Sequence, residues 1–133
     1  MDFVLGVLLG IGLAGLAVYA WRNVRAGRAA GIPVVLGAFT PSEVMTALAL
    51  GSTAVKIFPA HHLGPKYFKD LNGPFPGVPL IPSGGVNATN AHDFLVAGAL
   101  AVSAGTDVVS PADVAAANWS SITTKAKTFC AAL

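Results

Sequence analysis

A lysine interrupts an apolar run that otherwise has the composition of a buried strand. Residues 55–60 read VKIFPA, and strand alternation would place Lys56 and Phe58 on one face and Val55 and Ile57 on the other. An apolar interior favours the neutral amine of a lysine, and a neutral amine can attack a ketone to form a Schiff base. The alternative is a lysine at a sheet edge whose ammonium group reaches water.

Two further stretches combine glycine with a hydroxyl side chain. Residues 83–86 read SGGV, and residues 103–107 read SAGTD. Glycines after a strand let backbone N–H groups approach an anion closely, and the start of the next helix adds its positive dipole end. An ordinary turn is the simpler explanation of a lone Gly-Gly pair. The carboxylate of Asp107 would repel a bound anion if it pointed inward, so we expect either that it points away or that anion binding is weak.

Short apolar runs recur along the chain at the spacing expected of strands that alternate with helices. The runs are residues 32–39, 53–60, 78–86 and 100–109. The predicted helices are residues 41–50, 64–73, 88–98 and 120–133. Strands and helices that alternate in this way form βα units around a parallel sheet, whose strands are apolar on both faces. The predicted fold class is therefore α/β.

The first of these helices has a well-defined start signal. Thr40 can cap the helix, Pro41 suits its first turn, and Glu43 completes a capping box. Glu43 is the only glutamate in the chain, so we expect it to be committed to the helix start.

The N-terminal segment differs in character from the rest. Residues 3–21 contain 19 consecutive positions without a charge, and all three arginines of the chain follow at positions 22, 25 and 28. A run of about 20 apolar residues can span a bilayer, and positive charge after it places the following domain in the cytoplasm. We therefore predict a membrane helix and its flank over residues 1–30 and a cytoplasmic domain over residues 31–133. A buried helix, or a segment foreign to the domain, is the alternative.

The composition argues against several classes of partner and of binding site. The chain of 133 residues is 54% hydrophobic and 11% charged, with a formal net charge of +2. No basic stripe follows residue 31, which argues against a nucleic-acid partner. The single cysteine, Cys130, excludes an internal disulfide and a cysteine metal cluster. His61 and His62 are adjacent, which favours surface loop residues over metal ligands, and we predict neither metal nor cofactor.

Taken in order, VKIFPA, GPFPGVPLIPSGGV and GALAVSAGTDVV resemble the aldolases that cleave 2-keto-3-deoxy-6-phosphogluconate. Residues 31–133 carry the resemblance, through K-(I/F)-F-P-A on one strand, GPFP in the next loop and (S/T)-G-G-(I/V) on the following strand. The resemblance implies a (β/α)8-barrel-type fold, of which this chain has about four βα units, corresponding to strands five to eight. The expected architecture is a half barrel preceded by an apolar helix.

The resemblance also implies a role for each matching residue. Lys56 would form the Schiff base, Phe58 would line the apolar wall beside the substrate, and Pro59 would stop the strand at the catalytic end. The groups that would hold a phosphate are Ser83, Gly84, Gly85, Gly105 and Thr106. The implied reaction is class I aldol cleavage of a phosphorylated keto sugar acid to pyruvate and glyceraldehyde 3-phosphate.

The chain departs from the family pattern at positions that this reaction needs. The family's general base is a glutamate on strand two, and an arginine and a threonine on strands two and three hold the substrate carboxylate. Strands one to four have no counterpart here, and Ala104 stands where the family has glycine. We therefore expect a homo-oligomer or a complementing half-barrel chain. The alternatives are a membrane-anchored half barrel that binds an anionic ligand or a partner without catalysis, and a truncated or fused gene product.

Overall fold

The computed structural model describes residues 18–19 and 21–133. The predicted membrane helix over residues 3–21 therefore lies almost wholly outside the described part of the chain. Within the described part, no helix is both long enough and apolar enough to cross a bilayer.

A helix over residues 21–29 precedes the sheet. Val24 is fully buried, and the Gly27 carbonyl accepts the N–H of Ile32 at 2.8 Å, which turns the chain toward the first strand. Arg28 lies across the backbone of Gly51, where an added Cβ atom would collide with the guanidinium. The predicted division of the chain between residues 30 and 31 stays a prediction.

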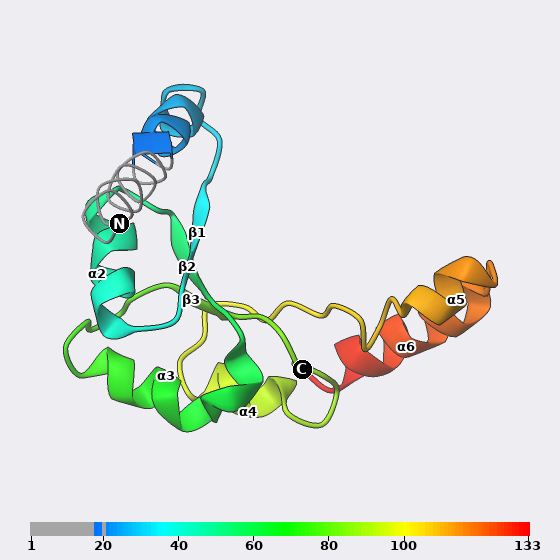
Figure 1. Cartoon of the computed structure of the whole chain (residues 1–133). Helices are drawn as coiled ribbons and strands as arrows, with labels where there is room; N and C mark the ends of the chain where they lie inside the picture. Colours follow the sequence, from blue (N-terminus) through cyan, green and yellow to red (C-terminus); the bar gives the residue numbers. More distant parts are fainter. Residues whose placement is uncertain (1–17, 20) are drawn as a thin grey trace, which may run out of the picture.

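The centre of the fold is a parallel sheet in the order β1-β2-β3 (Figure 1). Its strands are β1 (Val35–Ala38), β2 (Ala54–Ile57) and β3 (Leu80–Pro82). Lys56 pairs with Gly37 on one side and with Ile81 on the other, so the lysine sits on the middle strand of the described sheet. The parallel α/β prediction is confirmed for these three strands.

The prediction of a fourth strand is wrong in the described structure. Residues 100–109 contain no strand, although the Leu100 N–H donates to the Leu80 carbonyl at 2.8 Å and the Ser103 N–H donates to the Pro82 carbonyl at 3.3 Å. The segment thus runs parallel to β3 for a few residues and then turns away. Its apolar composition suits a strand, but a regular ladder does not form along β3.

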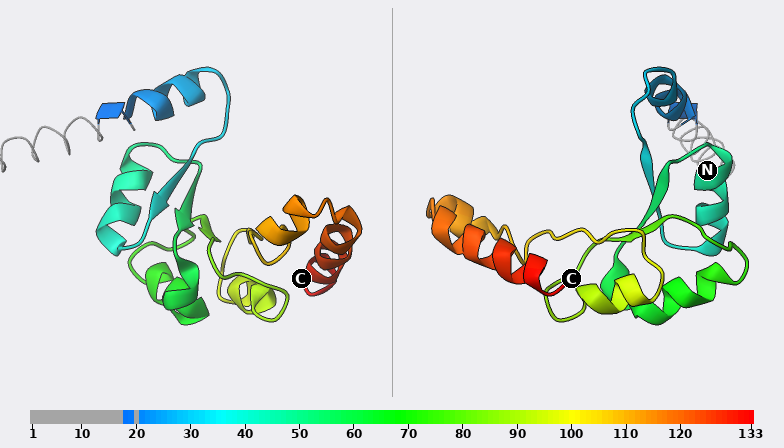
Figure 2. Two further views of the ribbon diagram at one scale, coloured as in Figure 1. Left: turned by 45° about the vertical axis from the view of Figure 1, so that its right-hand side comes forward. Right: turned by 180° about the vertical axis from the view of Figure 1, so that it is seen from behind.

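The helices divide into two groups. The predicted α2 (Pro41–Ala49), α3 (Gly64–Asn72) and α4 (Ala91–Val96) are present, and Figure 1 shows them gathered around one side of the sheet. α5 (Pro111–Ala115), which the sequence reading missed, and α6 (Trp119–Ala131) form an arm that projects from the other side (Figure 2).

The two faces of the sheet differ in their surroundings. The covered face is apolar and buried, with Leu36 partly exposed; its residues are Leu36, Ala38, Val55, Ile57, Leu80 and Pro82. The opposite face, called the open face below, consists of Val35, Gly37, Lys56 and Ile81, together with Phe58 and Ser83 just past the strand ends. Val35, Gly37, Lys56 and Phe58 are exposed, whereas Ala54, which shares this side, is buried.

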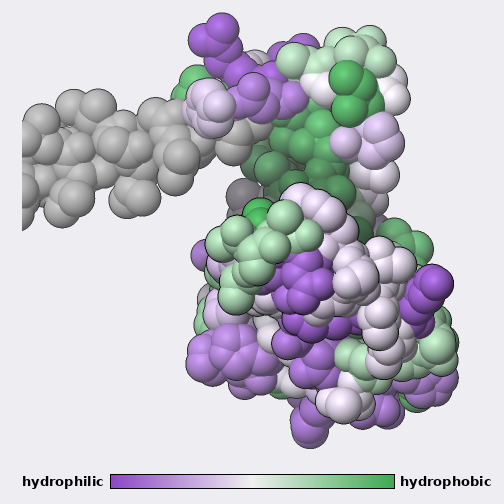
Figure 3. Space-filling model, turned by 90° about the vertical axis from the view of Figure 1, so that its right-hand side faces the viewer, coloured by the Kyte–Doolittle hydropathy of each residue, from purple (hydrophilic) through white to green (hydrophobic). Residues whose placement is uncertain are grey.

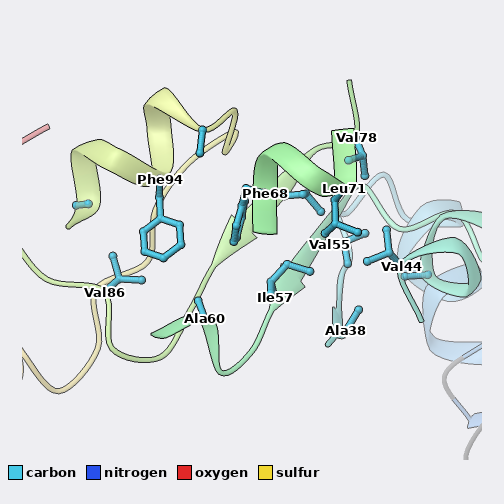
Figure 4. Packing of buried hydrophobic residues seen from close by; sticks show 14 of the residues in the cluster. Ala38, Val44, Val55, Ile57, Ala60, Phe68, Leu71, Val78, Val86 and Phe94 are labelled. Atoms are coloured by element: carbon cyan, nitrogen blue, oxygen red, sulfur yellow. The ribbon is translucent and has the colours of Figure 1, made fainter. Parts of the chain in front are cut away.

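The hydrophobic core lies between the covered face and helices α2, α3 and α4 (Figure 4). Phe68 from α3 and Phe94 from α4 are its largest fully buried side chains, at 0% and 1% exposure, and their rings meet edge to face with centroids 5.1 Å apart. Val44 and Ala47 bring α2 against the same strands. This packing holds β2 and β3 through their covered face and leaves the open face toward solvent.

The predicted capping box at the start of α2 is confirmed. The Thr40 hydroxyl accepts the N–H of Glu43, and the Glu43 carboxylate accepts the N–H groups of Phe39 and Thr40 at 2.7 and 2.8 Å. The hydrogen bonds from Phe39 and Thr40 lower the pKa of Glu43 from its ordinary 4.5. Tyr67 donates its hydroxyl to the Phe39 carbonyl at 2.8 Å, and burial, followed by the Glu43 charge, raises its pKa.

Loss of this cap should be measurable. Thr40→Ala should reduce the free energy of unfolding by about 1 kcal/mol at pH 7, as expected for an N-cap residue. Because the folded-state pKa of Glu43 lies below 4.5, its stabilising effect is present above pH 4.5 and is lost as pH falls through the folded value. The stability difference between wild type and Glu43→Gln, from thermal unfolding at several pH values, should therefore shrink on acidification. A constant difference would contradict this account.

Candidate active site

Lys56 lies at the middle of the open face, on the central strand of the three. Its side chain is exposed, which corrects the expectation of a lysine enclosed in an apolar interior. The flanking residues Val55 and Ile57 are fully buried, so strand alternation turns the lysine alone outward. The burial of Lys56 would need strands on the opposite side of the site, and the described part of the chain does not supply them.

Phe58 and Pro59 follow Lys56 at the carboxyl end of β2. The Lys56 Nζ atom lies 5.3 Å from the centroid of the Phe58 ring, within the range of a cation–π contact. Phe58 is 53% exposed, so its ring forms an apolar wall that remains open to a ligand. Pro59 stands two residues after the end of β2 and leads into the short helix η1 (Ala60–His62).

Backbone hydrogen bonds join the Ser83-Gly84-Gly85 turn to residues 57–61, which follow Lys56. The Ser83 N–H donates to the Ile57 carbonyl at 3.0 Å, the Ala60 N–H donates to the Ser83 carbonyl at 2.8 Å, and the His61 N–H donates to the Gly84 carbonyl at 3.1 Å. These bonds hold the turn directly beside Phe58 and Pro59. The fold thus brings together six of the eight residues predicted to form the site.

The turn has a conformation that suits an anion. Gly84 and Gly85 have φ angles of +83° and +74°, which side chains rarely adopt. Within the described residues, the N–H groups of these two glycines have no hydrogen-bond acceptor. Asn90 donates its side-chain amide to the Gly85 carbonyl at 3.0 Å and accepts the N–H of Asn87 at 2.9 Å, which fixes the turn from the far side. These two backbone N–H groups are therefore candidate donors for an anion.

Adding a methyl group at Gly84 should disturb this turn. A Cβ atom there would lie 2.9 Å from the Phe58 ring and would require a strained backbone. Gly84→Ala should therefore lower the free energy of unfolding by about 1–3 kcal/mol, as measured by urea denaturation. Gly105→Ala is the matched control, because no heavy atom lies within 4 Å of its Cβ position. Equal losses in the two variants would contradict the close fit of Gly84.

Gly105 and Thr106 lie on the neighbouring segment. Ser103 ties that segment to the end of β3, since its hydroxyl donates to the Pro82 carbonyl at 2.9 Å. Two residues later the chain makes an exposed turn, in which the Gly105 carbonyl accepts the N–H groups of Val108 and Val109. Gly105 and Thr106 therefore follow the same end of the sheet as Ser83, without a hydrogen bond to the glycine turn.

A pocket of about 340 Å³ opens beside this turn, between residues 87–89 and α6. Asp107 lines it together with Lys125. Lys125 forms an ion pair with Asp113 of α5, and the hydrogen bonds from Lys125 and Ser110 lower the pKa of Asp113. Asp107 is thus placed at a pocket that the sequence reading did not foresee.

The remaining acid and base candidates lie away from Lys56 or have other partners. Glu43 caps α2, and Asp70 forms an exposed ion pair with Lys66 at 2.7 Å. The rings of His61 and His62 lie tilted against one another with centroids 3.8 Å apart, and both residues are exposed on η1. Among the residues described, no group of three or more His, Cys, Asp or Glu side chains could hold a metal ion.

Comparison with known protein families identifies the family to which this chain is related. The family described as "Aldolase: KDPG and KHG aldolase" matches residues 21–125, which is most of the chain. The chain belongs to the KDPG and KHG aldolase family. Its match extends through the sheet, the glycine turn and most of the projecting arm.

Individual members of the aldolase family agree with this assignment. The 2-dehydro-3-deoxy-phosphogluconate aldolase of Pseudoalteromonas atlantica is 34% identical over 103 residues, which are 77% of this chain and 48% of that protein. A solved structure described as native KDPGal has a TM-score of 0.74 and 29% identity, over 82% of this chain and 52% of that one. The chain thus spans about half the length of the aldolases that it matches.

A second solved aldolase structure is informative about chemistry. KDPG aldolase from Legionella pneumophila, with pyruvate captured at low pH as a covalent carbinolamine intermediate, has a TM-score of 0.67 and 32% identity. It is covered over 52% of its length, and this chain over 82%.

Sequence reading missed the two asparagines that brace the glycine turn. Asn87 and Asn90 have the spacing of a local side-chain turn, and asparagine often bonds nearby backbone groups in this way. That spacing was the available signal, but the contact between Asn90 and the Gly85 carbonyl depends on the fold of the whole turn.

Proposed function

We propose that this chain carries the Schiff-base half of an aldolase-type active site, with Lys56 as the nucleophile. The observation that carries the proposal is the juxtaposition of Lys56, the open Phe58 ring and a glycine turn with two unused N–H donors. Membership of the aldolase family and the carbinolamine captured in the Legionella pneumophila relative support it.

The proposed substrate is a 2-keto-3-deoxy sugar acid that carries a phosphate, such as 2-keto-3-deoxy-6-phosphogluconate. The neutral Nζ atom of Lys56 attacks the keto carbon to give a carbinolamine, which loses water and becomes an iminium ion. The bond between C3 and C4 then breaks, and its electron pair moves into the iminium to form an enamine. Glyceraldehyde 3-phosphate leaves, and protonation and hydrolysis of the enamine release pyruvate and free Lys56.

The glycine turn would bind the phosphate of this substrate. Gly84 and Gly85 supply N–H donors, and Ser83 adds a hydroxyl at the same end of the sheet. Gly105 and Thr106 would contribute from the adjacent turn. Asp107 carries a negative charge close to that turn in sequence, which opposes anion binding and would limit affinity.

Cleavage also needs a base that removes the proton from the C4 hydroxyl as the C3–C4 bond breaks. None of the open-face residues defined above carries a carboxylate, and Glu43, the one glutamate of the chain, is held by the α2 cap. The base would therefore come from outside the open face. A homo-oligomer or a complementing half-barrel chain would supply it.

A second candidate function is ligand binding without catalysis. The same lack of a carboxylate on the described open face favours it, since the two N–H donors of the glycine turn would bind an anion equally well. Lys56 would then serve as a charge rather than as a nucleophile.

Borohydride trapping with pyruvate separates these two functions. The purified full chain is incubated with pyruvate, reduced, and digested for peptide mass mapping. A reduced pyruvyl adduct on Lys56 supports the Schiff-base function. A folded sample that binds phosphate but yields no adduct would leave only the binding function.

A further inference from the structure

We propose that the pocket between residues 87–89 and α6 is a separate binding site and that it takes a small organic ammonium ion. The pocket, of about 340 Å³, lies where the arm meets the rest of the chain. One wall comes from residues 87–89, another from Asp107 and Val108, and the third from α6. The residues that line it are not those of the proposed aldolase site, so the inference does not depend on the chemistry of Lys56.

The charges around the pocket favour a cation. Lys125 lines the pocket, but its ammonium group is bound to Asp113 of α5, which offsets the positive charge. Asp107 also lines the pocket, and within the part of the chain that the structure describes it forms no ion pair. The three side chains together leave one negative charge, which Asp107 places at the wall of the pocket.

The hydrogen-bonding groups of the pocket are mostly acceptors. Thr124 and Thr128 donate their hydroxyl protons to the carbonyls of Ser120 and Thr124, at 3.0 and 3.1 Å, so their oxygens can serve a ligand only as acceptors. The Thr89 hydroxyl likewise donates to Asn87 Oδ1 at 2.6 Å, and the side-chain N–H groups of Asn87 are the exception to this pattern. An ammonium ion has only donors and matches such a set of oxygens.

The size and the apolar part of the lining suit an organic amine better than a metal ion. Val108 and Phe129 give a hydrocarbon body a surface to pack on. A calcium ion takes about six to eight oxygen ligands, whereas Asp107 is the one carboxylate among the described lining residues. Pockets of this volume are typical of small-molecule sites.

The surface of the arm argues against a protein in the same place. The arm faces the viewer in Figure 3, where hydrophilic residues, in purple, lie among pale and apolar ones. A mixed surface of this kind offers no broad apolar patch to a protein partner on this side. The occupant is therefore a small molecule.

A ligand in this pocket would hold the arm in place. Because it would contact residues 87–89 and α6 at once, its binding opposes separation of α6 from the rest of the chain. With the ligand at ten times its Kd, exchange of the α6 amide hydrogens through that separation should slow about tenfold.

Titration of the full chain with cyclohexylammonium at pH 7, followed by NMR, tests the site. Asp107→Asn should weaken binding about fivefold, as expected for an exposed ion pair. Asp93→Asn is the matched control, because Asp93 is exposed on α4, outside this pocket, and its replacement changes the net charge equally. That variant should bind as wild type does. Equal losses in the two variants would show non-specific attraction and would overturn the proposal.

A second pair of variants tests the wall that α6 provides. Thr128 and Thr123 each donate to the carbonyl four residues earlier, but only Thr128 lines the pocket. Thr128→Val should weaken binding about threefold through the lost acceptor, whereas Thr123→Val should leave it unchanged. The same affinity in both variants would remove α6 from the site.

Matched analogues and hydrogen exchange complete the test. Cyclohexanol and cyclohexanecarboxylate should bind more weakly than cyclohexylammonium, and only the ammonium ion should slow exchange of α6. An analogue that bound as tightly would overturn the assignment of the ligand class. Absence of cyclohexylammonium binding at millimolar concentration, or binding that left α6 exchange unchanged, would refute the site.

Discussion

Replacing Lys56 with alanine should abolish the borohydride-trapped pyruvyl adduct and leave the fold intact. The amine is the only group of the open face that can form an imine, so its removal leaves no electron sink for cleavage. Because the Lys56 side chain is exposed, its truncation should change the free energy of unfolding by no more than about 0.5 kcal/mol. Mass mapping of the reduced peptide and urea denaturation of the same sample measure the two quantities.

A second lysine variant shows whether the adduct is specific. Lys69 is exposed on α3, outside the site, and Lys69→Ala should retain the full adduct on the peptide that contains Lys56. Lys56→Arg keeps the positive charge but cannot form the imine, so it should also lose the adduct. Trapped pyruvate that persists in Lys56→Ala, spread over other lysines, would show random surface reaction and would remove Lys56 from its catalytic role.

Replacing Phe68 with alanine should have the largest effect on stability. Phe68 is fully buried and packs edge to face on Phe94, with ring centroids 5.1 Å apart. Truncation of a buried phenylalanine typically costs about 3–5 kcal/mol, from lost burial and from the cavity that remains. Small domains have about 5–15 kcal/mol of total stability. The urea midpoint of Phe68→Ala, followed by circular dichroism, should therefore fall steeply.

Phe58→Ala is the matched control for this loss. The same atoms are removed, but the Phe58 ring is 53% exposed, so the change in unfolding free energy should be within about 0.5 kcal/mol. If Phe58→Ala destabilised the chain as much as Phe68→Ala, the open face would already be covered by parts of the chain beyond those described. The pair of variants therefore tests the core and the exposure of the site together.

Local signals in the sequence predicted local structure well. The Thr40 and Glu43 capping box forms as expected, because all of its hydrogen bonds lie within a few residues. The missed helix α5 has a similar start, with Ser110 as the cap, Pro111 in the first turn and Asp113 three residues after the cap. Its five residues lie between the predicted strand over residues 100–109 and the predicted helix over residues 120–133, in a stretch to which the sequence analysis assigned no element.

Long-range features were harder to predict. Strand composition suggested a fourth strand over residues 100–109, but a strand also needs a regular ladder to a neighbour, and only Leu100 and Ser103 bond to β3. The expected burial of Lys56 was wrong for a similar reason. A lysine in a strand is enclosed only if other structure covers its face of the sheet, and the composition of its own strand does not show whether such structure is present. By contrast, the position of Ser83 beside Phe58 follows from parallel pairing, since carboxyl ends of adjacent strands meet at one edge.

The projecting arm has a consequence for how the molecule opens. α5 and α6 pack mainly on one another, and Phe129 is the one residue of α6 in the core cluster. A segment anchored at so few points can detach without disrupting the strands, because local opening costs less than global unfolding. Amide hydrogens of α6 would then exchange with solvent through this partial opening, whereas those of β2 would exchange only when the whole core unfolds. We therefore expect the arm to open as a separate cooperative unit before the strands unfold.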